Sequence, residues 1–169
     1  SAPDVLVRQG GGYALRVAPD DIDARRFESL ADEAEDLLAT GDMARAAARA
    51  AAALALWSGE ALAPFAHEPW ARAEATRLQE RRLAAIEDRA TAELALGQHA
   101  RLVAELEPHV AAQPLREQLR GQLMLALYRS GRQADALAVY RQGREQLAEE
   151  LGIDPSPALV ALHQAILEQ

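Results

Sequence analysis

The amino-acid sequence predicts an all-α protein, an array of about seven helices preceded by a short β-hairpin. Three observations predict this fold. Alanine supplies 39 of the 169 residues and aromatic residues only 4%, a composition typical of closely packed helices. Two segments in the C-terminal half repeat each other at a fixed spacing. Near the start, three consecutive glycines separate two short alternating stretches, which favours a hairpin.

The composition also narrows the function. A formal net charge of −8 is the wrong sign for a surface that binds phosphate groups, so we do not expect the main nucleic-acid-binding surface here. Cysteine is absent, which excludes disulfides and thiolate metal sites. Neither an apolar run of about 18 residues nor a secretory signal is visible, so we expect no membrane span and a cytoplasmic location.

The hairpin is expected over Val5–Val17, which reads VLVR, QGGG and YALRV. Glycine tolerates positive φ, so Gly10–Gly12 suit the turn. An isolated two-stranded hairpin is marginal in water. We therefore expect this element to be the least stable part of the chain, or to pack on the first helix through Tyr13 and Leu15.

The first two helices are predicted from their caps and their apolar spacing. Asp23 suits the N-cap of the first helix, and Gly41 suits its end. Apolar residues recur at intervals of three and four: Phe27, Leu30, Ala34, Leu37 and Leu38. Asp42 should cap a second helix from Met43 to Trp57. Because that helix is nearly all alanine, we expect it between close neighbours.

A long helix is expected from Pro69 to Leu96, because no other proline or glycine interrupts this segment. It would measure about 40 Å. Its buried stripe should comprise Leu78, Ala85, Ile86, Ala90 and Leu94. Trp57 and Trp70 bracket the turn before it. We expect both rings, with Phe65, to close that corner; the alternative is an exposed aromatic contact site for a partner.

The C-terminal half carries a repeat whose turn glycines lie 34 residues apart, which is the tetratricopeptide period. The structural positions of the repeat are Gly97, Pro114, Gly131, Ala136 and Tyr140. In the first copy, Arg89 and Glu93 occupy slots that hold leucines in the second, so packing there should differ. Gly41 begins a degenerate third copy. After Gly152, a last helix with Ser156 as N-cap should close the array.

Placing the second copy on the repeat template puts four residues on the concave face, as a candidate interaction site: Gln118, Gln122, Leu125 and Arg129. No catalytic constellation is present. The four histidines lack paired spacing, and the absence of lysine removes Schiff-base and Walker-type chemistry. We therefore expect no enzyme activity, no metal and no cofactor. The neighbours Arg116 and Glu117 fit either an ion pair at a helix start or part of a groove.

Several stretches together resemble the bacterial transcriptional activator domain of the Streptomyces antibiotic regulatory protein (SARP) family. They are WSGEAL, EPWARAEATRLQERR, PLREQL and LMLALYRSGRQADALAVYRQGREQLAEELGIDPSPAL, and the resemblance runs from about Tyr13 to the end. It implies a tetratricopeptide-like fold behind a winged-helix DNA-binding domain whose last element is a β-hairpin. The residues matching that exit are Gly11, Gly12, Tyr13, Leu15, Asp23, Arg26 and Phe27.

On this resemblance, residues 1–19 are the tail of a winged-helix domain and 20–169 are the activator domain. The implied function is transcriptional activation of a biosynthetic gene cluster, such as one for an antibiotic. The implied partners are proteins: a second copy, RNA polymerase, or other domains of the parent chain. DNA would be bound only through the missing winged-helix domain. Two alternatives stay open: a peptide-binding adaptor that uses the concave face, and a small-molecule sensor in a groove between helices.

Overall fold

The computed structural model describes residues 6–18 and 21–168, and within them it has the predicted fold. An antiparallel hairpin of β1 (Leu6–Gln9) and β2 (Gly12–Leu15) precedes the helices. The helices are α1 (Asp23–Ala39), α2 (Met43–Leu54), α3 (Pro69–Ala95), α4 (His99–Ala112), α5 (Glu117–Arg129), α6 (Gln133–Leu151) and α7 (Pro157–Leu167), and a short 3₁₀ helix, η2 (Ala63–Phe65), precedes α3. The all-α repeat array behind a hairpin is therefore confirmed.

Two predicted helix ends differ from the structure. Ile22, not Asp23, takes the N-cap position of α1, and the Asp23 carboxylate instead accepts from the Ala24 N–H at 2.7 Å. Helix α2 ends at Leu54 instead of Trp57. Its last turn tightens there, because the Trp57 N–H donates to the Leu54 carbonyl at 3.2 Å, and the chain then leaves toward α3.

Three turns between consecutive helices share one geometry, with a left-handed glycine directly after the C-cap residue of the helix. Gly41, Gly97 and Gly131 follow α1, α3 and α5 with φ of 83°, 79° and 78°. Other residues adopt this conformation only with strain, so glycine at these turns allows each pair of helices to reverse sharply. The turn after α1 thus has the same geometry as the two turns of the 34-residue repeat.

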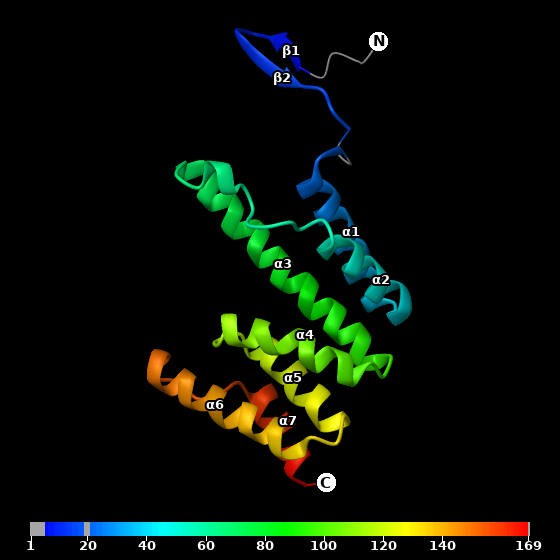
Figure 1. Ribbon diagram of the computed structural model, residues 1–169, viewed down its shortest axis with the longest axis vertical. Helices are drawn as coiled ribbons and strands as arrows, with labels where there is room; N and C mark the ends of the chain where they lie inside the picture. Colours follow the sequence, from blue (N-terminus) through cyan, green and yellow to red (C-terminus); the bar gives the residue numbers. More distant parts are fainter. Residues whose placement is uncertain (1–5, 19–20, 169) are drawn as a thin grey trace.

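The interior consists of two apolar clusters, and α3 contributes to both. The N-terminal cluster comprises Phe27, Ala31, Ala53, Leu78 and Ala85. The larger cluster begins on α3 at Leu83 and continues through α4, α5, α6 and α7. Figure 1 shows α3 running between the α1–α2 pair and the remaining helices. Helix α3 therefore joins the two halves of the array.

The odd-numbered helices form one layer, because α1 packs on α3, α3 on α5, and α5 on α7. The even-numbered helices α2, α4 and α6 each pack on the odd-numbered helices of this layer. We call this odd-numbered layer the α1–α7 layer. The residues predicted to face a partner lie on α5, within this layer.

At the corner before α3, only one of the three aromatic rings is packed inside. Trp57 meets Phe27 edge to face, with ring centroids 5.3 Å apart, and the Arg82 guanidinium lies 4.7 Å from its ring centroid. Phe65 and Trp70 are 50% and 57% exposed. The prediction that all three rings close the corner is therefore wrong. Trp57 already fills the space beside Phe27, which leaves Phe65 and Trp70 outside.

The hairpin projects beyond the helices (Figure 1). Arg8 pairs with Tyr13 across its strands, and Tyr13 is 76% exposed. The alternative in which Tyr13 packs on the first helix is therefore wrong, because the described hairpin stands apart from α1. Val5, the side chain of Leu15 and the predicted domain boundary at 19–20 lie outside the described residues.

The first copy of the repeat differs from the second where the sequence departs from the pattern. Glu93 is only 3% exposed, and its Oε1 accepts from Arg89 Nε and from Arg101 Nη2, both at 2.7 Å. Arg89 also pairs with Glu105 at 2.8 Å. A charged cluster thus joins α3 to α4 where leucines join α5 to its neighbours.

Candidate interaction site between helices α5 and α7

A groove of about 440 Å³ lies between α5 and α7, on the layer that contains the predicted interaction residues. Helix α5 supplies one wall, and the start of α7 supplies the other. The groove is lined by Glu117, Gln118, Gly121, Gln122, Leu125, Ser156, Ala158, Leu159 and Leu162. We refer to it as the α5–α7 groove.

Gly121 lies in the middle of α5, opposite two leucines of α7. A Cβ atom at this position would lie 3.5 Å from Leu159 Cδ1 and 3.7 Å from Leu162 Cδ2. These are ordinary van der Waals distances, so α7 approaches α5 closely without a clash. The floor of the groove is consequently the backbone of α5 with two leucines of α7 beside it.

The start of α7 is fixed to α5. Glu117 Oε2 accepts from the Ser156 N–H at 2.7 Å, and the Ser156 hydroxyl caps the helix by accepting from the Leu159 N–H at 3.4 Å. Further along, the His163 ring stacks on Tyr140 with centroids 3.9 Å apart. These contacts hold the walls of the groove in place, so a partner meets a preformed surface.

Three of the four predicted interaction residues line this groove, and the fourth does not. Gln118 is exposed at the rim, and Leu125 is half-buried. Gln122 is 8% exposed, because its Nε2 donates to the Glu87 carbonyl at 2.8 Å and to Thr91 Oγ1 at 3.0 Å. Arg129 lies outside the groove, and its Nη1 donates to the Leu94 carbonyl at 3.0 Å.

Gln122 and Arg129 therefore fasten α5 to α3. The Gln122 amide is buried in its hydrogen bonds, whereas Arg129 is exposed and gives one hydrogen bond to α3. The opposite wall of the groove, Ala158, Leu159 and Leu162, was not among the predicted interaction residues. Gly121 was the available signal, since a glycine inside an apolar helix marks a close approach of another element.

Arg116 and Glu117 do not act as a pair. Arg116 Nε binds Glu87 Oε1 at 2.7 Å and its Nη1 binds Glu80 Oε2 at 2.8 Å, whereas Glu117 holds the start of α7. The hydrogen bonds to Glu87 and Glu80 raise the pKa of Arg116. Its charge is therefore neutralised within the α1–α7 layer, and no Arg lines the α5–α7 groove.

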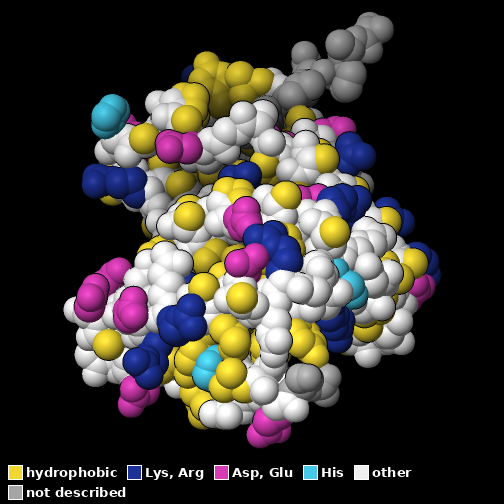
Figure 2. All heavy atoms as spheres, turned by 60° about the horizontal axis from the view of Figure 1, so that its bottom comes forward, with side chains coloured by type: hydrophobic (Ala, Val, Ile, Leu, Met, Phe, Trp, Pro, Cys, Tyr) yellow, Lys and Arg dark blue, Asp and Glu magenta, His cyan; other side chains and the backbone are white. Residues whose placement is uncertain are grey.

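The remaining edge of the layer is charged but internally paired. Arg77 of α3 bonds to Glu28 of α1, and Arg81 bonds to Asp32 and, at 3.1 Å, to Glu35. Figure 2 shows Arg side chains interspersed with Asp and Glu side chains over the face it presents. A surface with both signs mixed offers no extended positive field for a phosphate backbone.

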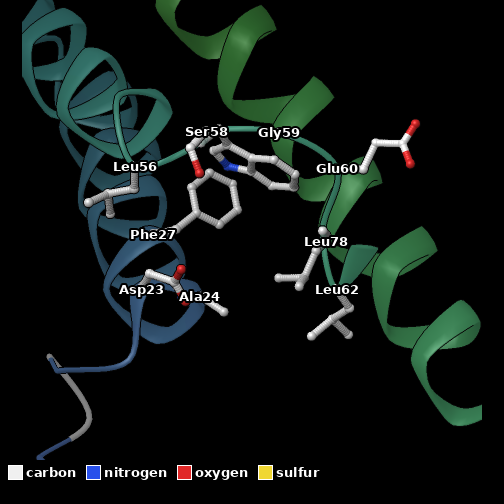
Figure 3. A pocket seen from close by; sticks show the side chains of 11 residues that line it. Asp23, Ala24, Phe27, Leu56, Ser58, Gly59, Glu60, Leu62 and Leu78 are labelled. Atoms are coloured by element: carbon white, nitrogen blue, oxygen red, sulfur yellow. The ribbon is translucent and has the colours of Figure 1, made fainter. Parts of the chain in front are cut away.

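A smaller cavity of about 160 Å³ lies between the start of α1, the 56–62 loop and α3. Figure 3 shows Phe27 and Leu78 at this cavity, with the Glu60 carboxylate directed away from it. A binding site for a small ligand usually contains a few polar groups that converge on the ligand. The polar groups around this cavity do not converge. We interpret the cavity as a packing gap at the corner before α3. It does not support the hypothesis of a small-molecule sensor.

Within residues 6–18 and 21–168, no three His, Asp or Glu side chains gather in a way that would hold a metal ion. The helices of this part of the chain are also too short or too polar to cross a bilayer.

Comparison with known proteins settles the family. The sequence profile described as "Bacterial transcriptional activator domain" matches residues 22–167. The chain belongs to the bacterial transcriptional activator domain family. This match covers every helix of the array and confirms the resemblance seen in the sequence.

Relatives of this activator domain are transcriptional regulators. The chain is 50% identical over 164 residues to the regulatory protein AfsR of Streptomyces griseus. That alignment covers 97% of this chain but only 17% of AfsR. It is 42% identical over 166 residues to the regulatory protein DnrI of Streptomyces peucetius, covering 98% of this chain and 61% of DnrI. The chain thus spans less than two thirds of the length of either relative.

A solved structure shares the fold of this activator domain. Mycobacterium tuberculosis EmbR, in complex with a low-affinity phosphopeptide, is 37% identical and superposes with a TM-score of 0.91. The alignment covers 98% of this chain and 44% of EmbR. The assignment to SARP-type regulators and to a helical activator domain is therefore confirmed.

Proposed function

We propose that this chain is the regulatory and activation domain of a SARP-type transcriptional activator, and that it acts through protein–protein contacts. The family match over residues 22–167 carries this proposal. The proposed parent protein works in the cytoplasm and activates a biosynthetic gene cluster. In it, residues 1–19 are the last hairpin of a winged-helix DNA-binding domain, and residues 20–169 are the activator domain.

The α5–α7 groove is the proposed contact surface. Leu125, Leu159 and Leu162 make it apolar, and its polar side chains at Glu117 and Ser156 already bond to the protein. Such a groove fits a partner segment that inserts apolar side chains, as an amphipathic helix does. The candidate partners are RNA polymerase, a second copy of the activator, or another domain of the parent chain.

A phosphopeptide is a poor fit to this groove. EmbR was solved with a phosphopeptide. Recognition of a phosphate needs arginines that are free to form bidentate bonds. No Arg lines the α5–α7 groove, and Glu117 places a carboxylate at its rim. In this chain we therefore propose an apolar segment, not a phosphorylated one, as the occupant.

The test compares two glutamate substitutions on α7 in the parent regulator. Ala158→Glu places a charged side chain in the groove, while Ala161→Glu places one at an exposed position outside it. A carboxylate in the first turn of a helix is stabilising, so Ala158→Glu should fold. We expect Ala158→Glu to lower transcription from a target promoter at unchanged DNA affinity, with Ala161→Glu behaving as wild type. Equal activity of both variants would refute the groove as the contact surface.

The proposed division of labour also makes a prediction for DNA binding. The isolated chain carries a formal net charge of −8 and mixes both signs on its surface. We expect no sequence-specific DNA binding by residues 1–169 in a mobility-shift assay at moderate salt, and specific binding by the parent chain. Tight, sequence-dependent binding by the fragment alone would contradict the proposal.

A peptide-binding adaptor is the second candidate, and the same groove is the observation that favours it. The two candidates differ in what precedes the chain in the gene. A winged-helix domain immediately upstream supports the transcriptional activator. A different upstream segment supports the adaptor, for which Ala158→Glu should abolish capture of a partner peptide without any effect on transcription.

A further inference from the structure

The end of the array nearest the hairpin exposes two aromatic rings side by side. Phe65 ends η2, Trp70 is the second residue of α3, and their ring centroids are 5.6 Å apart. The two rings are 50% and 57% exposed. They contact each other without joining either apolar cluster. We call Phe65 and Trp70 the aromatic pair.

The backbone around the aromatic pair is ordered by its own hydrogen bonds. The Phe65 N–H donates to the Leu62 carbonyl at 2.8 Å, and the Glu68 N–H donates to the Phe65 carbonyl at 2.9 Å. Leu62 has a φ of 55°, which a leucine adopts only with strain. The turn thus fixes the backbone that carries both rings, which favours a preformed contact surface.

The hairpin lies toward the same end of the molecule, and it too lacks a cover. Figure 1 shows the hairpin beyond the N-terminal ends of α1 and α3. Leu6 and Tyr13 are 61% and 76% exposed. A two-stranded hairpin is marginal by itself. Two apolar surfaces, the hairpin and the aromatic pair, are therefore left uncovered at one end of the array.

We propose that the aromatic pair is the docking surface for the domain to which the hairpin belongs. That occupant follows from the chain itself, because residues 16–22 reach at most about 25 Å when fully extended, which keeps the hairpin's domain close to the array. Trp is among the residues that dominate binding energy at interfaces. Docking on the pair would fix the orientation of the DNA-binding domain on the array. The inference rests on the proposed function, which supplies that upstream domain.

Hydroxyl-radical footprinting of the parent chain and of residues 1–169 tests the docking directly. The fragment contains both apolar clusters complete, so it provides the undocked reference. We expect oxidation of Trp70 and Phe65 to fall severalfold in the parent chain. Leu151, 53% exposed at the end of α6, is the control and should be oxidised equally in both. Equal oxidation of Trp70 in parent and fragment would overturn the inference.

A double variant, Phe65→Ser with Trp70→Ser, adds an energetic readout. Since both rings are largely exposed, we expect the melting temperature of the fragment to change little. In the parent chain, hydrogen exchange of residues 6–15 should become severalfold faster, because the hairpin's domain loses its support. Unchanged exchange in the parent would overturn the inference, as would protection of Trp70 that appears only at high protein concentration, which indicates a second copy.

The outcomes separate this inference from the proposed function. If no winged-helix domain precedes the chain in the gene, the proposed function fails and the inference fails with it. If the domain is present and Trp70 stays as reactive as in the fragment, only the docking surface is wrong.

Discussion

Substituting Gly143 of α6 with alanine should destabilise the protein, although alanine is the better helix former. Gly143 is buried where the side chain of Arg120 crosses α6. A Cβ atom at position 143 would lie 2.3 Å from Arg120 Cδ and 2.4 Å from its Nε. Both distances are far below van der Waals contact, so either the helices separate or Arg120 leaves.

Arg120 cannot move aside cheaply. It is 1% exposed, and its guanidinium donates to the carbonyls of Val139 at 3.0 Å and Pro114 at 2.8 Å, and to Gln146 Oε1 at 2.5 Å. Burial lowers its pKa, with only the charge of Glu117 acting against this effect. The hydrogen bonds to the guanidinium are therefore what makes its burial tolerable.

The magnitude follows from competing effects. Alanine in place of glycine inside a helix stabilises by about 1 kcal/mol. Overpacking a core costs about 1–3 kcal/mol, and each hydrogen bond of a charged group contributes about 1.5–3 kcal/mol. Losing one such bond in addition to the strain outweighs the helix propensity. We expect Gly143→Ala to lower the free energy of unfolding by about 2–4 kcal/mol.

Gly121 of α5 provides the matched control. It too lies inside a helix, but an added Cβ there meets only ordinary contacts, so Gly121→Ala should be neutral or stabilise by up to about 1 kcal/mol. Urea unfolding with linear extrapolation measures both variants, provided that the m-value stays constant. Replacing Arg120 with methionine should reduce the cost of Gly143→Ala by at least about 1 kcal/mol, since the two sites are coupled. If Gly143→Ala were as stable as Gly121→Ala, the argument about Arg120 would be refuted.

Three further predictions, made with four substitutions, test the packing and the titrating groups. Ala136 is fully buried and Ala148 is exposed, so Ala136→Leu should cost about 1–3 kcal/mol while Ala148→Leu changes the thermal midpoint little; equal effects would contradict the repeat register. Burial lowers the pKa of His109, so the unfolded chain takes up the proton first and stability falls as the pH drops below 6.5; in His109→Gln the urea midpoint should fall less over that range. Burial raises the pKa of Asp88, so its contribution to stability is present below pH 3.8 and is lost as the pH rises through the raised pKa. Asp88→Asn should therefore stabilise the protein at pH 7 but not below pH 3.8. An unchanged free energy of unfolding at pH 7 would contradict this prediction.

Much of the fold was predictable because local signals agreed with the global pattern. Asp42 and Ser156 cap α2 and α7 as expected, since each side chain accepts a backbone N–H three residues on. Pro69 begins α3 as predicted, because proline lacks the N–H that the first turn leaves unused. Where a capping residue, a glycine and a regular apolar spacing coincide, the sequence correctly predicts the helix boundary.

The interaction residues were harder to predict, because a repeat template indicates which face of the helix a residue lies on but not which hydrogen bonds its side chain forms. The template placed Gln122 on an open face, but its amide is held by Glu87 and Thr91 across α3. It placed Arg129 beside it, but that side chain holds the Leu94 carbonyl. Long polar side chains can form hydrogen bonds with a neighbouring helix, and the sequence does not specify which helix lies within their reach.

The aromatic corner shows the opposite limit. Large apolar rings are usually buried, so Phe65 and Trp70 were expected inside with Trp57. Trp57 packs on Phe27, whereas Phe65 and Trp70 follow the left-handed Leu62 and stay largely exposed. The hydrophobicity of a ring predicts that it tends to be buried. It does not predict whether the ring is buried within its own domain or against another one.

Helix α3 has a mechanical consequence because it supplies buried residues to both apolar clusters. Its 27 residues make it about 40 Å long, with Trp70 of the aromatic pair in its first turn and the Arg129–Leu94 contact near its last. A load applied at the first turn cannot be absorbed by a flexible joint, since no glycine or proline breaks the helix after Pro69. A force on the first turn of α3 is therefore carried along the whole helix to its last turn, which contacts α5, the helix that forms one wall of the α5–α7 groove.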